Sequence, residues 1–173
     1  MNLLVKVSVR YGLLAGIFGC VLIFGFYYLG PHPFVIPVYM DFRIILFALF
    51  IFFALREIRD YYQNGVLYFW QGIFTSFLFT ITYAALSSLI LVLFMRIEPA
   101  FLTDYIRLSI QQLKSLPPEV IERIGNEVYN RNLELLPATN TFDLGFLYFS
   151  QSFMISLFIS IILSVILRRQ PKT

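Results

Sequence analysis

Charged residues are scarce in this sequence. Asp, Glu, Lys and Arg make up 13% of the 173 residues, about half of the roughly 25% that soluble domains carry. Mean hydropathy is +0.78, and several long runs contain no charge at all. This composition excludes an ordinary soluble domain and predicts an all-α membrane protein.

Groups that carry chemistry are equally scarce. The only cysteine, Cys20, cannot form an internal disulfide and lies in an apolar run, where we expect it to be a packing residue. The only histidine, His32, stands between two prolines in a predicted turn, so we expect a solvated or interfacial side chain. The sequence shows no nucleophile with a base, paired carboxylates, zinc-ligand spacing, phosphate loop or long basic tract. We therefore expect no catalytic residues, no cofactor, no metal and no nucleic-acid partner.

Long apolar segments take the place of these motifs. Four are predicted to cross the membrane as a four-helix bundle: 11–29, 36–55, 66–95 and 144–167. A membrane-spanning helix needs about 20 apolar residues. The uncharged part of the second segment, 44–55, is too short by itself, and the rest includes Asp41 and Arg43.

Asp41 and Arg43 have two interpretations. Lying close to one end of the segment, they can anchor it at the membrane interface, where a charge costs little. Alternatively, they form a polar site that faces the bundle. Because they are two positions apart, they point to different sides of a helix, and we do not expect them to pair along it.

Small residues recur at every fourth position in three of the segments. The spacing places them on one face of each helix, and small side chains let membrane helices approach closely. The residues are Gly12 and Gly16 in the first segment, Gly72, Ser76, Thr80, Ala84 and Ser88 in the third, and Ser152, Ser156, Ser160 and Ser164 in the last. We expect them to be packing positions, with the third helix as the one on which the others pack. The serine stripe could instead line a substrate path.

The distribution of charge predicts the orientation. Basic residues of the N-terminal lead, the loop after residue 55 and the C-terminal tail fit a cytoplasmic location for both termini. The insertion 96–143 carries a balance of −2 and is placed outside. Helical spacing of its apolar residues predicts two amphipathic helices, the second over 120–128. They could rest on the membrane surface or bundle rim, or could form a docking surface for a partner.

Four loose motifs resemble a known family. They are the glycine-bearing first helix from Tyr11-Gly12 to Gly19, Gln63-Asn64-Gly65 leading to Gly72-Ile73, Ile97-Glu98-Pro99, and the basic stop Leu167-Arg168-Arg169. Over nearly its whole length the chain resembles the bacterial membrane-protein family called domain of unknown function 4199. The resemblance implies a small four-span protein of Bacteroidetes-like bacteria. It brings no assigned activity and no catalytic residues.

Two functions are compatible with these features. The first is a non-enzymatic protein of the bacterial inner membrane that acts as an accessory, scaffold or anchoring subunit, with a protein partner or a second copy of itself. The alternative is lipid or small-molecule binding or transport in a polar groove between helices. In both cases membrane lipids surround the chain.

Overall fold

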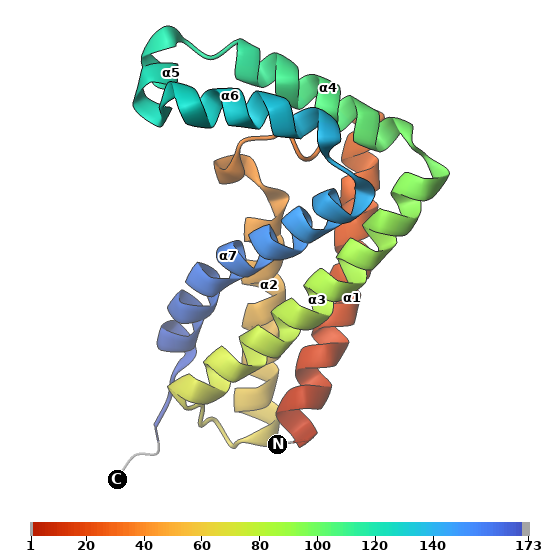
Figure 1. Cartoon of the computed structure of the whole chain (residues 1–173). Helices are drawn as coiled ribbons and strands as arrows, with labels where there is room; N and C mark the ends of the chain where they lie inside the picture. The colour runs from red at the N-terminus through yellow and green to blue at the C-terminus, as the bar shows by residue number, and fades with distance from the viewer. Residues whose placement is uncertain (1, 171–173) are drawn as a thin grey trace.

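Helices account for all the regular elements of the structure, a computed structural model that describes residues 2–170 except the side chains of Asn2 and Val38. Four long helices run alternately up and down, and three shorter ones form an arm across one end of the bundle (Figure 1). The long helices are α1 (Asn2–Leu29), α2 (Phe42–Glu57), α3 (Phe69–Ile97) and α7 (Thr141–Leu167); the arm consists of α4 (Ala100–Lys114), α5 (Pro118–Ile124) and α6 (Asn126–Leu135). The all-α prediction is confirmed.

Three of the helices are long and apolar enough to cross a membrane: α1 from Leu3, α3 and α7. The second predicted segment differs from expectation. Residues 36–41 form a connection with a short 3-10 turn, Val38–Met40, and α2 begins only at Phe42 and has 16 residues. It continues into a π-helical turn, Ile58–Tyr62. The four-span count therefore stays a prediction.

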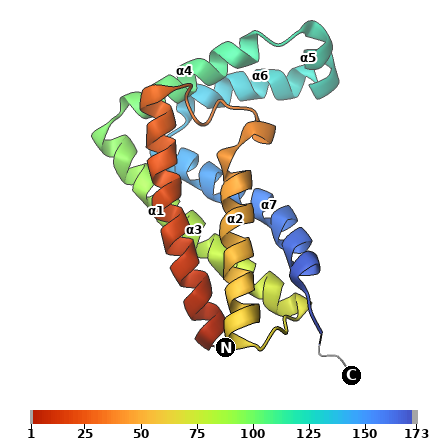
Figure 2. The ribbon, with the colours of Figure 1, turned by 180° about the vertical axis from the view of Figure 1, so that it is seen from behind.

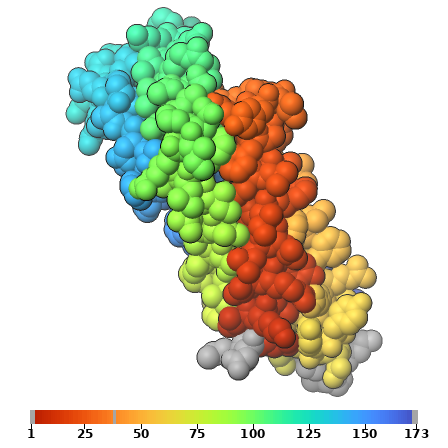
Figure 3. Space-filling view, turned by 90° about the vertical axis from the view of Figure 1, so that its right-hand side faces the viewer, coloured from red at the N-terminus to blue at the C-terminus, as the bar shows by residue number. Residues whose placement is uncertain are grey.

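The helix α3 occupies the centre of the bundle. It packs along α1 on one side and along α7 on the other, while α2 packs against α7 and α1. Figure 3 shows α1 and α3 side by side along one face of the molecule. Beyond α7, Leu67 and Arg169 exchange two backbone hydrogen bonds of 2.9 and 3.0 Å, which ties the end of α7 to the segment before α3. The predicted role of the third helix as the one on which others pack agrees with this arrangement.

Local sequence signals explain where α5, α6 and α7 begin. Asn140 is the N-cap of α7, accepting hydrogen bonds from the backbone of Phe142 and Asp143, as expected of a polar residue that satisfies the free N–H groups of a first turn. Pro118 opens α5 at the position where its missing N–H costs nothing. The predicted helix over 120–128 is wrong in one respect: Gly125, at φ +90°, divides it into α5 and α6.

We call the end of the bundle at which α1 begins and α7 ends the terminal end, and the opposite end the arm end. At the arm end, residues 30–41 connect α1 to α2, and this connection lies beneath α4 (Figure 2). At the terminal end lie the start of α1, the end of α2, the start of α3 and the end of α7.

Candidate functional site

Asp41 and Arg43 form an ion pair at the arm end, contrary to the sequence expectation. Asp41 is the N-cap of α2 and has an extended backbone, φ −66° and ψ 119°, so it does not follow helical spacing. Its carboxylate accepts a hydrogen bond from the Arg43 backbone N–H at 2.9 Å and from the Arg43 Nε at 2.9 and 3.0 Å. The prediction failed because it treated both residues as part of one helix.

The Arg43 side chain faces the bundle and reaches α7. Its Nη1 donates to the Tyr148 carbonyl and the Ser152 Oγ, both at 3.3 Å, and its Nη2 donates to the Gln151 Oε1 at 2.8 Å and to Asp41. The guanidinium also lies 4.5 Å from the centre of the Tyr148 ring. A guanidinium has five N–H donors, and here all five are directed at protein acceptors. The cluster therefore fastens α2 to α7, and it leaves Arg43 no donor for an anionic ligand.

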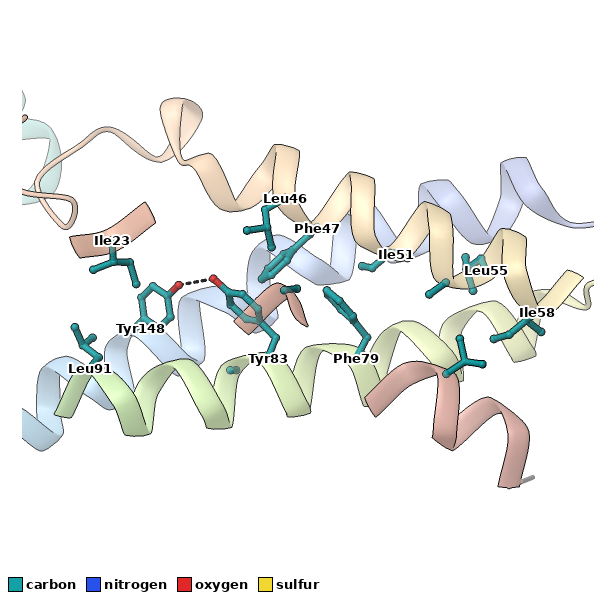
Figure 4. Close-up of a cluster of buried hydrophobic side chains, with 14 of the residues drawn as sticks. Ile23, Leu46, Phe47, Ile51, Leu55, Ile58, Phe79, Tyr83, Leu91 and Tyr148 are labelled. Carbon is teal, nitrogen blue, oxygen red and sulfur yellow. Dashed lines mark hydrogen bonds between the residues drawn. The ribbon is translucent and has the colours of Figure 1, made fainter. Parts of the chain in front are cut away.

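An aromatic core lies beside this cluster (Figure 4). The hydroxyls of Tyr83 and Tyr148 share a hydrogen bond, and the Phe47 ring meets Tyr83 edge to face with centroids 4.7 Å apart. Gly19 makes room for the pair, because a Cβ at this position would lie 2.6 Å from the Tyr83 hydroxyl oxygen. Sequence reasoning missed the tyrosine pair. The glycine in the first helix was its only local signal.

His32 is buried, so the expectation of a solvated side chain is wrong. Its Nε2 donates to the Phe101 carbonyl at 3.1 Å, and its Nδ1 accepts from the Phe34 backbone N–H at 3.3 Å. The imidazole is surrounded by the rings of Tyr27, Phe34, Phe101 and Tyr105. Burial lowers the pKa of His32, although the Phe101 carbonyl and the Asp104 carboxylate act in the opposite direction. His32 thus joins the α1–α2 connection to α4 in its neutral form.

Next to these two anchors lies a cavity of about 590 Å³, which we call the arm-end pocket. Its walls come from α1 at Phe26, from the α1–α2 connection at Ile36 and Pro37, from the start of α2 at Phe42, and from α4 at Leu108. A narrower cavity of about 70 Å³ adjoins it, since the two share Ile36 and Phe42, and it reaches the side chains of Arg43, Tyr148 and Gln151.

The small residues of the predicted packing faces lie in the two contact regions of α3, one with α1 and one with α7, which we call seams. At the α1–α3 seam, a Cβ on Gly12 would lie 2.7 Å from the Thr82 Cβ, and one on Gly16 would lie 2.9 Å from Leu86. At the α3–α7 seam, a Cβ on Gly72 would lie 2.6 Å from the Ser164 Oγ. Thr80 and Ser156 share a hydrogen bond across this seam. Of the remaining predicted positions, Ser76, Ala84, Ser152 and Ser160 are buried and Ser88 is half-buried. These small residues therefore serve to pack helices of the same chain against one another.

The terminal end carries a second polar group of residues. Glu57, in the last turn of α2, accepts hydrogen bonds from Arg10 and from the Tyr11 hydroxyl on α1. An open cavity of about 860 Å³ lies beside them, with Tyr61 and Tyr62 of the π-helical turn in its wall. The basic side chains at this end are Lys6, Arg10, Arg56, Arg59, Arg168 and Arg169; Lys172, which belongs to the predicted basic tail, lies outside the described residues.

Metal-ligating side chains do not gather anywhere in the described part of the chain: no three of its His, Cys, Asp or Glu residues lie close enough to hold an ion. Comparison with known proteins identifies a family. The model of a family described as "Protein of unknown function (DUF4199)" matches residues 10–169. No curated protein and no solved structure matches the chain.

Proposed function

The chain belongs to the DUF4199 family of proteins of unknown function, and from its geometry we propose that it acts by association, without enzymatic activity. Its role is that of an accessory, scaffold or anchoring subunit of an assembly in the bacterial inner membrane. The partner is another membrane subunit or a second copy of this chain.

The observation that carries this proposal is the arm. It extends sideways beyond the bundle (Figure 1), and α5 and α6 contain no buried residue. Val128 and Leu135 of α6 are more than half exposed, on the same side of the helix seven positions apart. A helix pair that only covered the bundle would bury its apolar side chains on it. Exposed apolar side chains on a projecting element are typical of an interaction surface.

The proposed topology has four spans and cytoplasmic termini. Three long apolar helices support a membrane location. For α2, the support is its position beside α1: Glu57 contacts Arg10 at one end, and the Phe42 ring stacks on Phe26 at the other, with centroids 5.8 Å apart. At 1.5 Å per residue, its 16 residues cover about 24 Å of a hydrocarbon layer about 30 Å thick.

The orientation is supported by the distribution of charge between the two ends. Basic side chains predominate at the terminal end, where Glu57 and Asp60 are the acidic ones; the arm end has more acidic than basic residues. Cytoplasmic loops of membrane proteins are enriched in Lys and Arg. The terminal end is therefore the proposed cytoplasmic end.

The alternative role, lipid or small-molecule binding in a polar groove between helices, finds little support at the serine stripe. Ser152, Ser156 and Ser164 are buried, and Ser156 and Ser164 contact α3 directly. Only a small cavity of about 70 Å³ lies along the stripe, beside Ser156 and Ser160. A cavity of suitable size lies instead at the arm end.

Particle size in mild detergent tests the association proposal. The full chain, extracted from its native membrane, should migrate as a complex larger than one 20.2-kDa chain with its micelle. The double variant Val128→Asp/Leu135→Asp should reduce it to a single chain, because charges on the exposed stripe prevent apolar contact. Asn130→Asp adds a charge to the same helix away from the stripe and should leave the complex intact.

Thermal melting of the purified variants distinguishes lost association from lost folding. Both variants should melt as the wild-type chain does, since α6 contributes nothing buried. A wild-type chain that migrates alone, or a complex that tolerates both aspartates, would contradict the proposal.

A further inference from the structure

The arm-end pocket is an apolar cavity with one charged residue in its wall. Its volume of about 590 Å³ falls in the range of about 300–1,000 Å³ typical of small-molecule sites. The charged residue is Asp41, whose carboxylate is already paired with Arg43. Because Arg43 directs all its donors at protein acceptors, neither residue offers a free charge to a ligand. The chemistry of the wall therefore suits an uncharged, apolar occupant.

The pocket lies at the edge of the apolar layer that the long helices define. Phe26 precedes the end of α1 by three residues, and Phe42 is the first residue of α2. Met40 in the pocket wall is 66% exposed, and Tyr39 and Leu29, within two residues of wall residues in the chain, are 81 and 90% exposed. Leu29 ends the membrane-length helix α1, and we expect large apolar side chains this exposed at the edge of the apolar layer to face lipid rather than water. An occupant of the pocket is then drawn from the bilayer.

The pocket is also rigid. Pro31, Pro33 and Pro37 all lie in its wall, and proline fixes the backbone φ angle. His32 fastens the same connection to α4 through the Phe101 carbonyl, and Asp41 fastens its other end to α2. A preformed cavity binds a ligand without the entropy cost of ordering its walls.

We propose that the arm-end pocket holds one acyl chain of a membrane phospholipid, whose headgroup stays outside, beside α4. An acyl chain is uncharged, flexible and present at high concentration where the pocket lies. A phospholipid headgroup does not fit the interior, because no unpaired cation lines it. This inference does not depend on the proposed association: a chain that forms no complex can still hold the lipid.

Fluorescence quenching by a brominated lipid tests the site. The only natural tryptophan, Trp70, lies exposed at the terminal end. In a Trp70→Phe background, Met40→Trp places a reporter at the exposed rim of the pocket without filling it. The full chain in detergent is titrated with phosphatidylcholine brominated on one acyl chain. We expect saturable quenching of the rim reporter at one lipid per chain, and only a shallow, non-saturating decrease for Trp70 in the otherwise unchanged protein.

Filling the pocket provides the decisive comparison. Ile36→Phe with Leu108→Phe, added to the reporter protein, should weaken the saturable quenching at least tenfold. Leu113→Phe, on the same helix but outside the pocket, should leave it unchanged. Non-saturating quenching at the rim, or saturation that the filled pocket retains, would overturn the proposal. A melting temperature equal to that of the reporter protein shows that the filled variant still folds.

Discussion

Along its two seams, α3 packs closely on α1 and α7 because small side chains lie against backbone there. At the arm end, in contrast, a few polar side chains hold together elements that are far apart in sequence. Seam contacts are short-range dispersion contacts spread over many residues. The buried hydroxyls of Ser88 and Ser164 find no hydrogen-bond partner among the described residues. At these two positions serine therefore matters more for its size than for its hydroxyl, whereas Ser156 uses its hydroxyl to bond Thr80 across the seam.

The arm end depends on single groups instead. Arg43 connects α2 to α7, and His32 connects the α1–α2 connection to α4. From this difference we expect the seams to be sensitive to added volume and insensitive to charge and pH. The arm end should respond to the loss of one charge or one proton. Three predictions test this comparison, beginning with the largest effect.

The substitution Asp41→Asn should have the largest effect. It keeps an N-cap for α2 but leaves the buried Arg43 guanidinium without its counter-charge. Breaking a buried ion pair by removing one partner costs about 3–5 kcal/mol. Reversible unfolding in detergent micelles measures the change in the free energy of unfolding.

Two further variants make this test specific. Adding Arg43→Met to Asp41→Asn should recover more than half of the loss, because no uncompensated charge then remains. Arg107→Gln, at the exposed Asp104–Arg107 pair, should change stability by less than about 1 kcal/mol. A double variant less stable than Asp41→Asn alone would show that the hydrogen bonds of Arg43 to α7 stabilise the fold even without its counter-charge.

The same glycine-to-alanine change should have opposite effects at two positions of α1. At Gly12 the new Cβ would lie 2.9 Å from the Phe79 backbone oxygen and 2.7 Å from the Thr82 Cβ, so α1 must move away from α3, at a cost of about 1–3 kcal/mol. At Gly25 no atom lies within 4 Å of the new Cβ. There alanine should stabilise by about 0.4–1 kcal/mol, because it restricts the unfolded chain. Equal effects at the two positions would show that close approach of α1 to α3 is not what makes the seam sensitive to added volume.

Local patterns were sufficient to predict the seams but not the arm end. The spacing of four in residues 152–164 identified the face of α7 that is buried, and the apolar runs identified three of the long helices. The partners of Arg43 on α7 lie more than 100 positions away in the chain, and the Phe101 carbonyl lies 69 positions from His32. No local pattern encodes these contacts, because they follow from how α2, α7 and α4 cross. The start of α2 was misplaced for a related reason: Asp41 caps the helix rather than belonging to it.

The smallest predicted effect is a pH dependence confined to the arm end. The neutral imidazole of His32 satisfies both its contacts, donating from Nε2 to Phe101 and accepting at Nδ1 from Phe34. A proton on Nδ1 would remove the second contact, and burial lowers the pKa of His32 below its ordinary 6.5. The folded chain then binds fewer protons than the unfolded chain. The contribution of neutral His32 to the free energy of unfolding is therefore fully present above pH 6.5 and decreases as the pH falls through this value.

Hydrogen exchange of backbone amides locates this effect. Between about pH 8 and about pH 5, after correction for the intrinsic exchange rate, protection in α4 should fall while protection in α3 and α7 stays constant. The other ionisable side chains that face His32 are those of Asp104, Tyr27 and Tyr105. His32→Gln keeps a donor and an acceptor but cannot take up the proton, so its α4 protection should be independent of pH. A pH response that persists in this variant would show that the buried imidazole is not its source, and the arm end would then not depend on the protonation of His32.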